Sequence, residues 1–190
     1  MKIVLASGSP RRKEIFTREG FDFTVVKSDY SEKSVSSPQK TAEDNAIGKA
    51  RDVFSRLSDE NVIVVGSDTV VFSDGKIIGK PRDEEDAEQT LLSLSGKTHG
   101  VVSAYAVVCK KGVFSGCDMT KVTFKKFSSE YVKDYIRRCS PLDKAGSYGI
   151  QDEDGPVEKY EGSYDCVVGF PTEKAMPVIR RLIADKDCKC

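Results

Sequence analysis

The chain has 190 residues, and its 30 Lys and Arg residues balance its 30 Asp and Glu residues, so its formal net charge at pH 7 is zero. This balance leaves no overall field that would attract nucleic acid or a membrane surface, and any anion site has to be a local group of basic side chains. No apolar run approaches the roughly 20 residues of a membrane span. We therefore expect one domain, residues 1–190, without nucleic-acid or membrane partners.

The histidine and cysteine content narrows the chemistry. His99 is the single histidine, which excludes a His-rich zinc site, and the nucleophile-elbow pattern of serine hydrolases does not occur. The six cysteines are scattered and no secretory leader precedes the first strand, so reduced thiols and a cytoplasmic location are expected. The terminal Cys188-Lys189-Cys190 could bind a soft metal, but a frayed tail is the favoured interpretation.

Apolar runs and turn residues predict strands that alternate with helices. In chain order, the expected strands are residues 3–6, 21–26, 62–65, 70–72, 101–109 and 113–124. The expected helices are residues 11–19, 41–57, 84–93, 130–138 and 172–184. Thr41 and Asp44 resemble a capping box for the second helix. This alternation is typical of an α/β domain, and the antiparallel hairpin within residues 101–124 makes the sheet mixed. Residues 27–40, rich in Ser and charge, are expected to form a mobile loop.

The first predicted strand runs into a Ser/Gly loop and then into a helix whose first turn carries two adjacent arginines. Ser9 is a good N-cap, and Pro10 fits the first helical position. A helix N-terminus presents free N–H groups and a partial positive charge, so Arg11 and Arg12 are unfavourable there unless a bound anion compensates them. The segment therefore predicts a phosphate site formed by Ser7, Ser9, Arg11 and Arg12. The alternative is ordinary packing with solvated arginines.

Two further polar residues are candidates because of their chemistry. Asp68 follows the apolar run 62–65, where a buried strand is expected to emerge, and ligand groups of open α/β sheets lie at such strand ends. The alternative is an aspartate that caps a turn. The amide of Gln151 offers a donor and an acceptor, which can complement N3–H and O4 of uracil or thymine, or can bind loop backbone instead.

Several segments, taken together, carry a family resemblance. They are the opening residues 1–14, Gly66-Ser67-Asp68-Thr69-Val70-Val71, Gly79-Lys80-Pro81, Leu94-Ser95-Gly96-Lys97-Thr98-His99, Asp143-Lys144-Ala145-Gly146-Ser147-Tyr148-Gly149-Ile150-Gln151 and Val167-Val168-Gly169-Phe170-Pro171. In this order they resemble the Maf family of nucleoside triphosphate pyrophosphatases, from Lys2 to about Ile183. The resemblance implies a mixed sheet flanked by helices, in two lobes with a nucleotide cleft. It also implies a homodimer as an expectation, because family members often dimerise.

The resemblance implies roles for single residues. Asp68 would be the catalytic group that orients or deprotonates the attacking water, and Thr69 beside it would line the base or phosphate pocket. Lys49 and Lys80 would neutralise the triphosphate and the departing pyrophosphate, although a lysine judged by residue type alone is most often a solvated surface group. Glu32 with Asp68 would hold Mg²⁺ or Mn²⁺, since a few hard oxygen ligands and phosphate oxygens suffice for such an ion.

The substrate expectation comes from one branch of the family. In the branch linked to dTTP and UTP, a threonine follows the catalytic aspartate and a glutamine stands at the position of Gln151. The resemblance thus implies hydrolysis of dTTP and UTP, with modified pyrimidine triphosphates as further candidates, to the monophosphate and pyrophosphate. Two alternatives stay open, namely an N7-methyl-GTP pyrophosphatase like the sister branch and a nucleotide-binding regulator of cell division without turnover. Asp68 argues against the regulator, because binding alone would not require a carboxylate beside phosphates.

Overall fold

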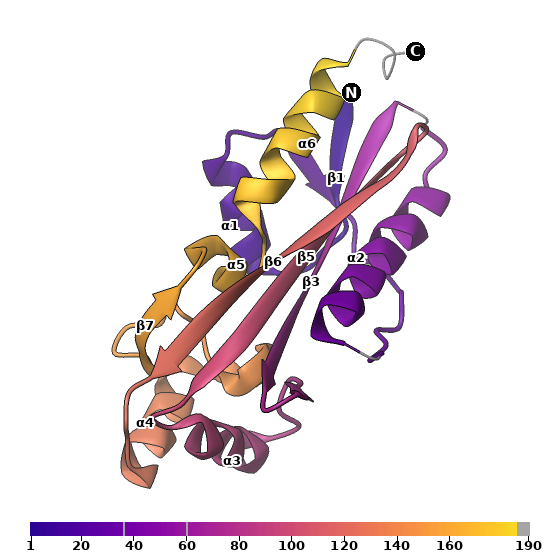
Figure 1. Cartoon of the computed structure of the whole chain (residues 1–190). Coiled ribbons are helices and arrows are strands. Elements are labelled where there is room, and N and C mark those ends of the chain that lie inside the picture. The colour runs from indigo at the N-terminus through magenta and orange to yellow at the C-terminus, as the bar shows by residue number, and fades with distance from the viewer. Residues whose placement is uncertain (36, 60, 186–190) are drawn as a thin grey trace.

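The computed structural model describes residues 1–35, 37–59 and 61–185 (Figure 1). Its strands are β1 (Lys2–Leu5), β2 (Phe23–Val25), β3 (Val62–Ser73), β4 (Lys76–Ile78), β5 (Thr98–Cys109), β6 (Gly112–Phe124) and β7 (Val157–Glu161). Its helices are α1 (Pro10–Arg18), α2 (Pro38–Ser55), α3 (Glu84–Leu94), α4 (Ser129–Cys139), α5 (Tyr164–Val168) and α6 (Thr172–Ala184), with 3-10 turns at Pro141–Asp143 and Ala145–Ser147. Within these ranges, no helix is both long and apolar enough to cross a bilayer. The Cys188-Lys189-Cys190 segment lies outside the described residues.

The strands form one mixed sheet in the order β2-β1-β3-β5-β6-β7, with β4 paired to β3. Strand β1 is parallel to both of its neighbours, and every other pair is antiparallel. Helices α1 and α6 lie on one side of the long strands and α2 lies on the other (Figure 1). The predicted fold class, a mixed sheet flanked by helices, is therefore confirmed.

Three apolar clusters attach the helices to the sheet. Side chains alternate along β3, so that Val62 and Val64 pack toward α2 while Ile63 and Val65 pack toward α1 and α6. The third cluster joins α3 and α4 to the opposite ends of β3, β5 and β6. The long strands thus carry one group of helices at each end (Figure 1), which is the two-lobed arrangement that the resemblance implied.

The prediction of a strand end before Asp68 is wrong. Residues 62–65 and 70–72 belong to the single strand β3, and Asp68 lies inside it, only 6% exposed. Polar residues in the middle of an apolar strand suggested a break. The strand continues because these groups find hydrogen-bond partners inside the protein: the hydroxyl of Ser67, for example, donates to the carbonyl of Ala104 at 2.7 Å.

The predicted start of the second helix is also wrong. Helix α2 begins at Pro38, and the side chain of Ser37 caps it. Thr41 lies inside the helix, where its hydroxyl accepts from the backbone N–H of Val35 at 3.0 Å, so it forms no capping box with Asp44. Strands β4 and β7 and helix α5 were not predicted, because each is too short for a periodic pattern to develop.

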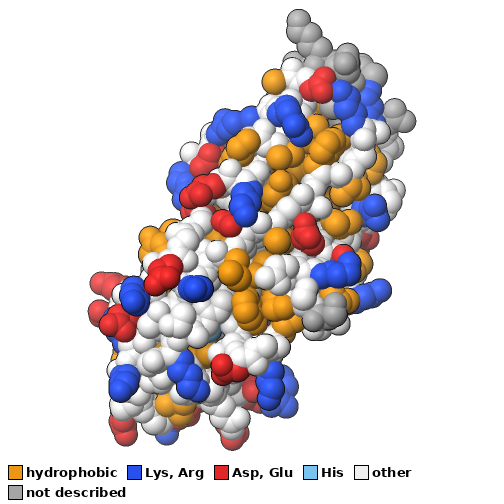
Figure 2. Space-filling view, viewed as in Figure 1, with side chains coloured by type: hydrophobic (Ala, Val, Ile, Leu, Met, Phe, Trp, Pro, Cys, Tyr) orange, Lys and Arg blue, Asp and Glu red, His pale blue; other side chains and the backbone are white. Residues whose placement is uncertain are grey.

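Basic and acidic side chains are interspersed over the face of the molecule shown in Figure 2, and hydrophobic side chains gather along its middle, over the long strands. Of the described cysteines, Cys117, Cys139 and Cys166 are free thiols. Because the net charge is zero and both signs are mixed over this face, any site that binds an anion has to be a local group of basic side chains.

Candidate functional site

Strand β1 leads the chain into the loop before α1. Ser9 is the N-cap with an extended backbone (φ −66°, ψ 122°), and Pro10 is the first helical residue, as predicted. The Ser9 side chain makes no capping hydrogen bond. The hydroxyl of Ser7 instead accepts from the backbone N–H of Ser9 at 3.2 Å. The first turn of α1 therefore keeps N–H groups and a positive dipole end available for an anion.

The guanidinium of Arg12 is held by three acceptors. Its Nε donates to the carbonyl oxygen of Gly169 at 2.8 Å, Nη1 donates to Ser7 Oγ at 3.2 Å, and Nη2 donates to Thr69 Oγ1 at 3.2 Å. A guanidinium has a second N–H on each terminal nitrogen. Arg12 is therefore fixed in orientation and can still bind an anion through Nη1 and Nη2.

The carboxylate of Asp68 is held from α2. Asn45 Nδ2 donates to Asp68 Oδ2 at 2.9 Å, and Lys49 Nζ donates to Asp68 Oδ1 at 2.7 Å. The same ammonium lies 2.6 Å from Glu32 Oε1, in the loop before α2. Two carboxylates thus converge on one cationic atom, and the Lys49 side chain is only 12% exposed. A carboxylate has about four acceptor sites, so Asp68 keeps lone pairs for a further ligand.

A gap in the strand pairing explains how Asp68 and Arg12 reach the same cavity. Strand β1 pairs with residues 62–65 of β3, and β4 pairs with residues 71–73. Along residues 66–70, that edge of β3 is left without a partner strand among the described residues, while β5 covers the other edge. A cavity of about 720 Å³ opens at this place, lined by the loop before α1, by α2 and by β3.

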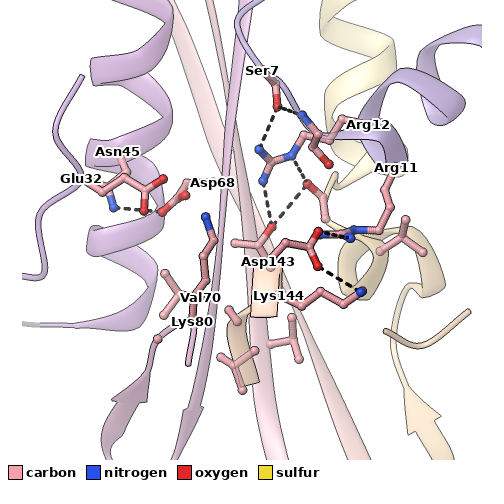
Figure 3. Close-up of a pocket in the computed structure, with 18 of the residues that line it drawn as sticks. Ser7, Arg11, Arg12, Glu32, Asn45, Asp68, Val70, Lys80, Asp143 and Lys144 are labelled. Carbon is pink, nitrogen blue, oxygen red and sulfur yellow. Dashed lines mark hydrogen bonds and ion pairs between the residues drawn. The ribbon is translucent and has the colours of Figure 1, made fainter. Parts of the chain in front are cut away.

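Every residue chosen from the sequence lines this cavity. They are Ser7, Ser9, Arg11, Arg12, Glu32, Lys49, Asp68, Thr69, Lys80 and Gln151. Figure 3 shows Glu32 and Asn45 beside Asp68 on one side, Ser7 and Arg12 on the other, and Lys80 reaching up between them. Residues far apart in the sequence are thus gathered at one site.

Charges across the cavity shift the pKa values of two of these groups. Burial raises the pKa of Glu32, but the hydrogen bond and charge of Lys49, with the charge of Lys80 beyond it, lower it more, so the net pKa lies below the ordinary value. Burial lowers the pKa of Arg12, while the charge of Asp68 opposes that change. Because an arginine normally titrates far above neutral pH, Arg12 stays cationic.

Sequence reasoning gave no role to several polar residues of this cavity, among them Asn45, Asp143 and Lys144. Asn45 lies one helical turn before Lys49 on the same face of α2, so the spacing of the two could have revealed it. Asp143 accepts from Arg11 Nη1 at 2.9 Å and from Lys144 Nζ at 3.0 Å, and all three line the cavity. Asp143 and Lys144 stood within a segment of the resemblance but received no role.

Comparisons with known proteins identify the relatives of this chain. The dTTP/UTP pyrophosphatase of Thermotoga maritima is 42% identical over 172 residues, which cover 90% of this chain and 84% of that protein. The dTTP/UTP pyrophosphatase of Thermococcus onnurineus is 45% identical, with 90% of this chain and 92% of that protein covered. The dTTP/UTP pyrophosphatase of Aquifex aeolicus is 39% identical, with 96% of each chain covered. A solved structure titled nucleoside-triphosphatase / dITP/XTP pyrophosphatase, from Mycobacterium abscessus, aligns with a TM-score of 0.48 and 18% identity over 97% of both chains. The family described as Maf-like protein matches residues 2–182, and the chain belongs to this Maf family.

Proposed function

We propose that the chain is a nucleoside triphosphate pyrophosphatase that hydrolyses dTTP and UTP to the monophosphate and pyrophosphate. One observation carries the proposal: a single cavity holds the cationic N-terminus of α1 with Arg12 and, across an unpaired strand edge, the oriented carboxylate of Asp68. Relatives named dTTP/UTP pyrophosphatase, 39–45% identical over most of the chain, support the substrate class.

The triphosphate binds to the cations of the cavity. Arg12 donates from its two terminal nitrogens, and the hydroxyls of Ser7 and Ser9 with the first turn of α1 surround the same anion. Arg11 and Lys80 add charge from opposite walls. Positive charge held near the departing pyrophosphate stabilises the transition state, where negative charge gathers on the leaving group.

Asp68 acts on the water that attacks the α phosphorus. Its carboxylate is fixed by Asn45 and Lys49, which leaves acceptor sites free toward the cavity. A fixed carboxylate can orient the water and accept its proton as the new P–O bond forms. The ammonium of Lys49 offsets the negative charge of the paired carboxylates, so that a polyphosphate can approach them.

The donors present fit a divalent cation. Asp68 and Glu32 both reach one cationic atom, Lys49 Nζ, at 2.7 and 2.6 Å, so both carboxylates can face one ion. The described residues contain no larger cluster of metal-ligating side chains. The pair of carboxylates suits Mg²⁺ or Mn²⁺, which takes one or two carboxylates and completes its shell with water and phosphate oxygens. Bound there, such an ion would neutralise phosphate charge and polarise the P–O bonds.

Gln151 is proposed to read the base. It lines the cavity, and its side-chain amide has no hydrogen-bond partner among the described residues. A free amide can pair its donor with O4 and its acceptor with N3–H of uracil or thymine. The homodimer and the cytoplasmic location expected from the resemblance stay predictions.

A nucleotide panel tests the proposal. The protein is incubated with Mg²⁺ and dTTP, UTP, CTP, GTP, ATP or N7-methyl-GTP, and released pyrophosphate is measured. Fastest release from dTTP and UTP supports the proposal. Turnover of N7-methyl-GTP alone, or tight binding without release, would contradict it. Hydrolysis in ¹⁸O-labelled water should place the label on the monophosphate, because the attack is at the α phosphorus.

A further inference from the structure

Behind the cavity wall, a chain of hydroxyl groups leads from Arg12 into the core. Thr69 on β3 and Ser103 on β5 are paired directly across the sheet, and their hydroxyl oxygens lie 2.9 Å apart. The Ser103 hydroxyl also lies 2.6 Å from the carbonyl oxygen of Cys166 in α5. Ser103 is fully buried and is not among the residues that line the cavity.

The direction of these hydrogen bonds follows from the number of protons available. A carbonyl oxygen only accepts, so the single hydroxyl proton of Ser103 goes to Cys166. Ser103 can then only accept from Thr69. The Thr69 proton is directed to Ser103 at 2.9 Å, or to the carbonyl of Gly169 at 3.3 Å, and never toward Arg12. A lone pair of Thr69 therefore faces Arg12 Nη2, which can only donate.

Ser103 also restrains the other main acceptor of Arg12. The carbonyl of Gly169, directly after α5, accepts from Arg12 Nε at 2.8 Å. The bond from Ser103 to Cys166 ties α5 to the sheet. One buried hydroxyl thus orients Thr69 and helps to hold the segment that carries Gly169, whose carbonyl also accepts from Ser67 Oγ at 3.1 Å.

We infer that Ser103 is a positioning residue for anion binding: it sets the hydrogen-bond direction of Thr69 and the placement of Gly169, and through both it aims the guanidinium of Arg12 at a phosphate group. Thr69 on this account acts as an acceptor for Arg12. The inference rests on the proposed function to the extent that Arg12 binds the phosphates of the substrate. The strength of the hydrogen bonds from Arg12 to a phosphate depends on the orientation of its guanidinium. Loss of the Ser103 hydroxyl therefore weakens phosphate binding, although Ser103 itself does not contact the ligand.

The test measures binding of inorganic pyrophosphate by calorimetry, which needs no turnover, alongside KM and kcat for the nucleotide hydrolysed fastest. In Ser103→Ala, we expect the pyrophosphate Kd and the KM to rise about tenfold, the size of one hydrogen bond to a charged group, with a smaller change in kcat.

Thr120→Val is the matched control. The hydroxyl of buried Thr120 donates to the carbonyl of Ser163, at the start of α5, at 3.0 Å, so it also ties α5 to the sheet but contacts neither Thr69 nor Gly169. This control should lower thermal stability as Ser103→Ala does, but leave pyrophosphate binding unchanged.

A double-mutant cycle separates positioning from general loosening. Since Ser103 and Thr69 act on Arg12 through one chain of bonds, Ser103→Ala should cost much less pyrophosphate affinity in a Thr69→Val background than alone. Unchanged binding in Ser103→Ala, or equal losses in Ser103→Ala and Thr120→Val, would overturn the inference. Arg12→Lys separates a failure of the proposed phosphate site from a failure of the role of Ser103. If Arg12→Lys and Ser103→Ala both bind pyrophosphate normally, the proposed phosphate site is wrong. If only Arg12→Lys loses affinity, the role of Ser103 alone is refuted.

Discussion

Asp68 and Thr69 are adjacent in β3, yet their side chains point to opposite faces of the sheet. Asp68 contacts Lys49 on α2, whereas Thr69 contacts Arg12 on α1. Successive side chains of a strand always alternate in this way. Both nevertheless line one cavity, because β3 has an edge without a partner strand between β1 and β4. The geometry separates a carboxylate side, with Asp68, from the proposed phosphate-binding side, with Arg12, within the width of one strand.

Asp68→Asn tests the carboxylate side. The substitution keeps the shape and removes the charge and the basic oxygen, so we expect kcat to fall about 100- to 10,000-fold, the range for loss of a general base. Pyrophosphate binding should persist because Arg12 is untouched. Asp118→Asn is the control, since Asp118 pairs with Lys174 and does not line the cavity. Full turnover in Asp68→Asn would show that another group activates the water.

Glu32→Gln tests the proposed cation site. Removing one of the two carboxylates should raise the half-saturating Mg²⁺ concentration at least about tenfold. Loss of a residue that only hydrogen-bonds a metal ligand already lowers metal affinity by about that factor. The readout is pyrophosphate release as a function of Mg²⁺ concentration at saturating nucleotide. Asp29→Asn provides a control in the same loop, since Asp29 pairs with Arg56 and lies outside the cavity lining. Identical Mg²⁺ curves for the wild type and Glu32→Gln would exclude Glu32 as a ligand.

Local signals in the sequence predicted the fold class and the anion site at the start of α1, whereas Thr69, Lys49, Lys80 and Glu32 were predicted from the family resemblance. Apolar alternation marks the strands, and the Ser/Pro/Arg signals at the start of α1 are local to one turn. Asn45 was also within reach, one turn from Lys49 on a predicted helix. Ser103 was not, since its partners follow from the register of β3 with β5 and from the position of α5, which no local pattern encodes. The continuity of β3 through Asp68 was missed for the same reason, because its polar groups are satisfied by distant segments.

Gly66→Ala tests how closely α2 must approach the sheet. A Cβ at Gly66 would lie 2.4 Å from the carbonyl oxygen of Ala46 and 2.9 Å from the backbone nitrogen of Ala50, both in α2. Backbone atoms cannot move aside like a side chain, so α2 has to shift away from β3. We expect a loss of about 1–3 kcal/mol in the free energy of unfolding.

The same shift should move Lys49 relative to Asp68 and lower kcat. Denaturant unfolding and turnover measure the two effects of Gly66→Ala. Gly79→Ala serves as the stability control, because no atom beyond its own residue and its two chain neighbours lies within 4 Å of a Cβ placed there. A Gly66→Ala variant with the stability and turnover of the wild type would show that the contact between α2 and β3 is not tight.

The single histidine predicts a specific dependence of stability on pH. His99 is 3% exposed, its Nε2 lies 2.9 Å from Tyr148 Oη, and its Nδ1 has no partner among the described residues. Burial lowers the pKa of His99 from 6.5 to about 4. Between these values the unfolded chain takes up a proton that the folded chain does not, so the penalty is absent above pH 6.5 and grows as the pH falls toward 4. At about 1.4 kcal/mol per pH unit, this penalty reaches roughly 3 kcal/mol at pH 4.

His99→Gln tests this penalty, because it keeps a nitrogen for Tyr148 and removes the titration. We expect the free energy of unfolding of His99→Gln, measured by urea denaturation from pH 7 to 4, to rise relative to that of the wild type by roughly 3 kcal/mol as the pH falls. Parallel pH profiles for the two proteins would mean that His99 takes up a proton as readily in the folded protein as in the unfolded chain.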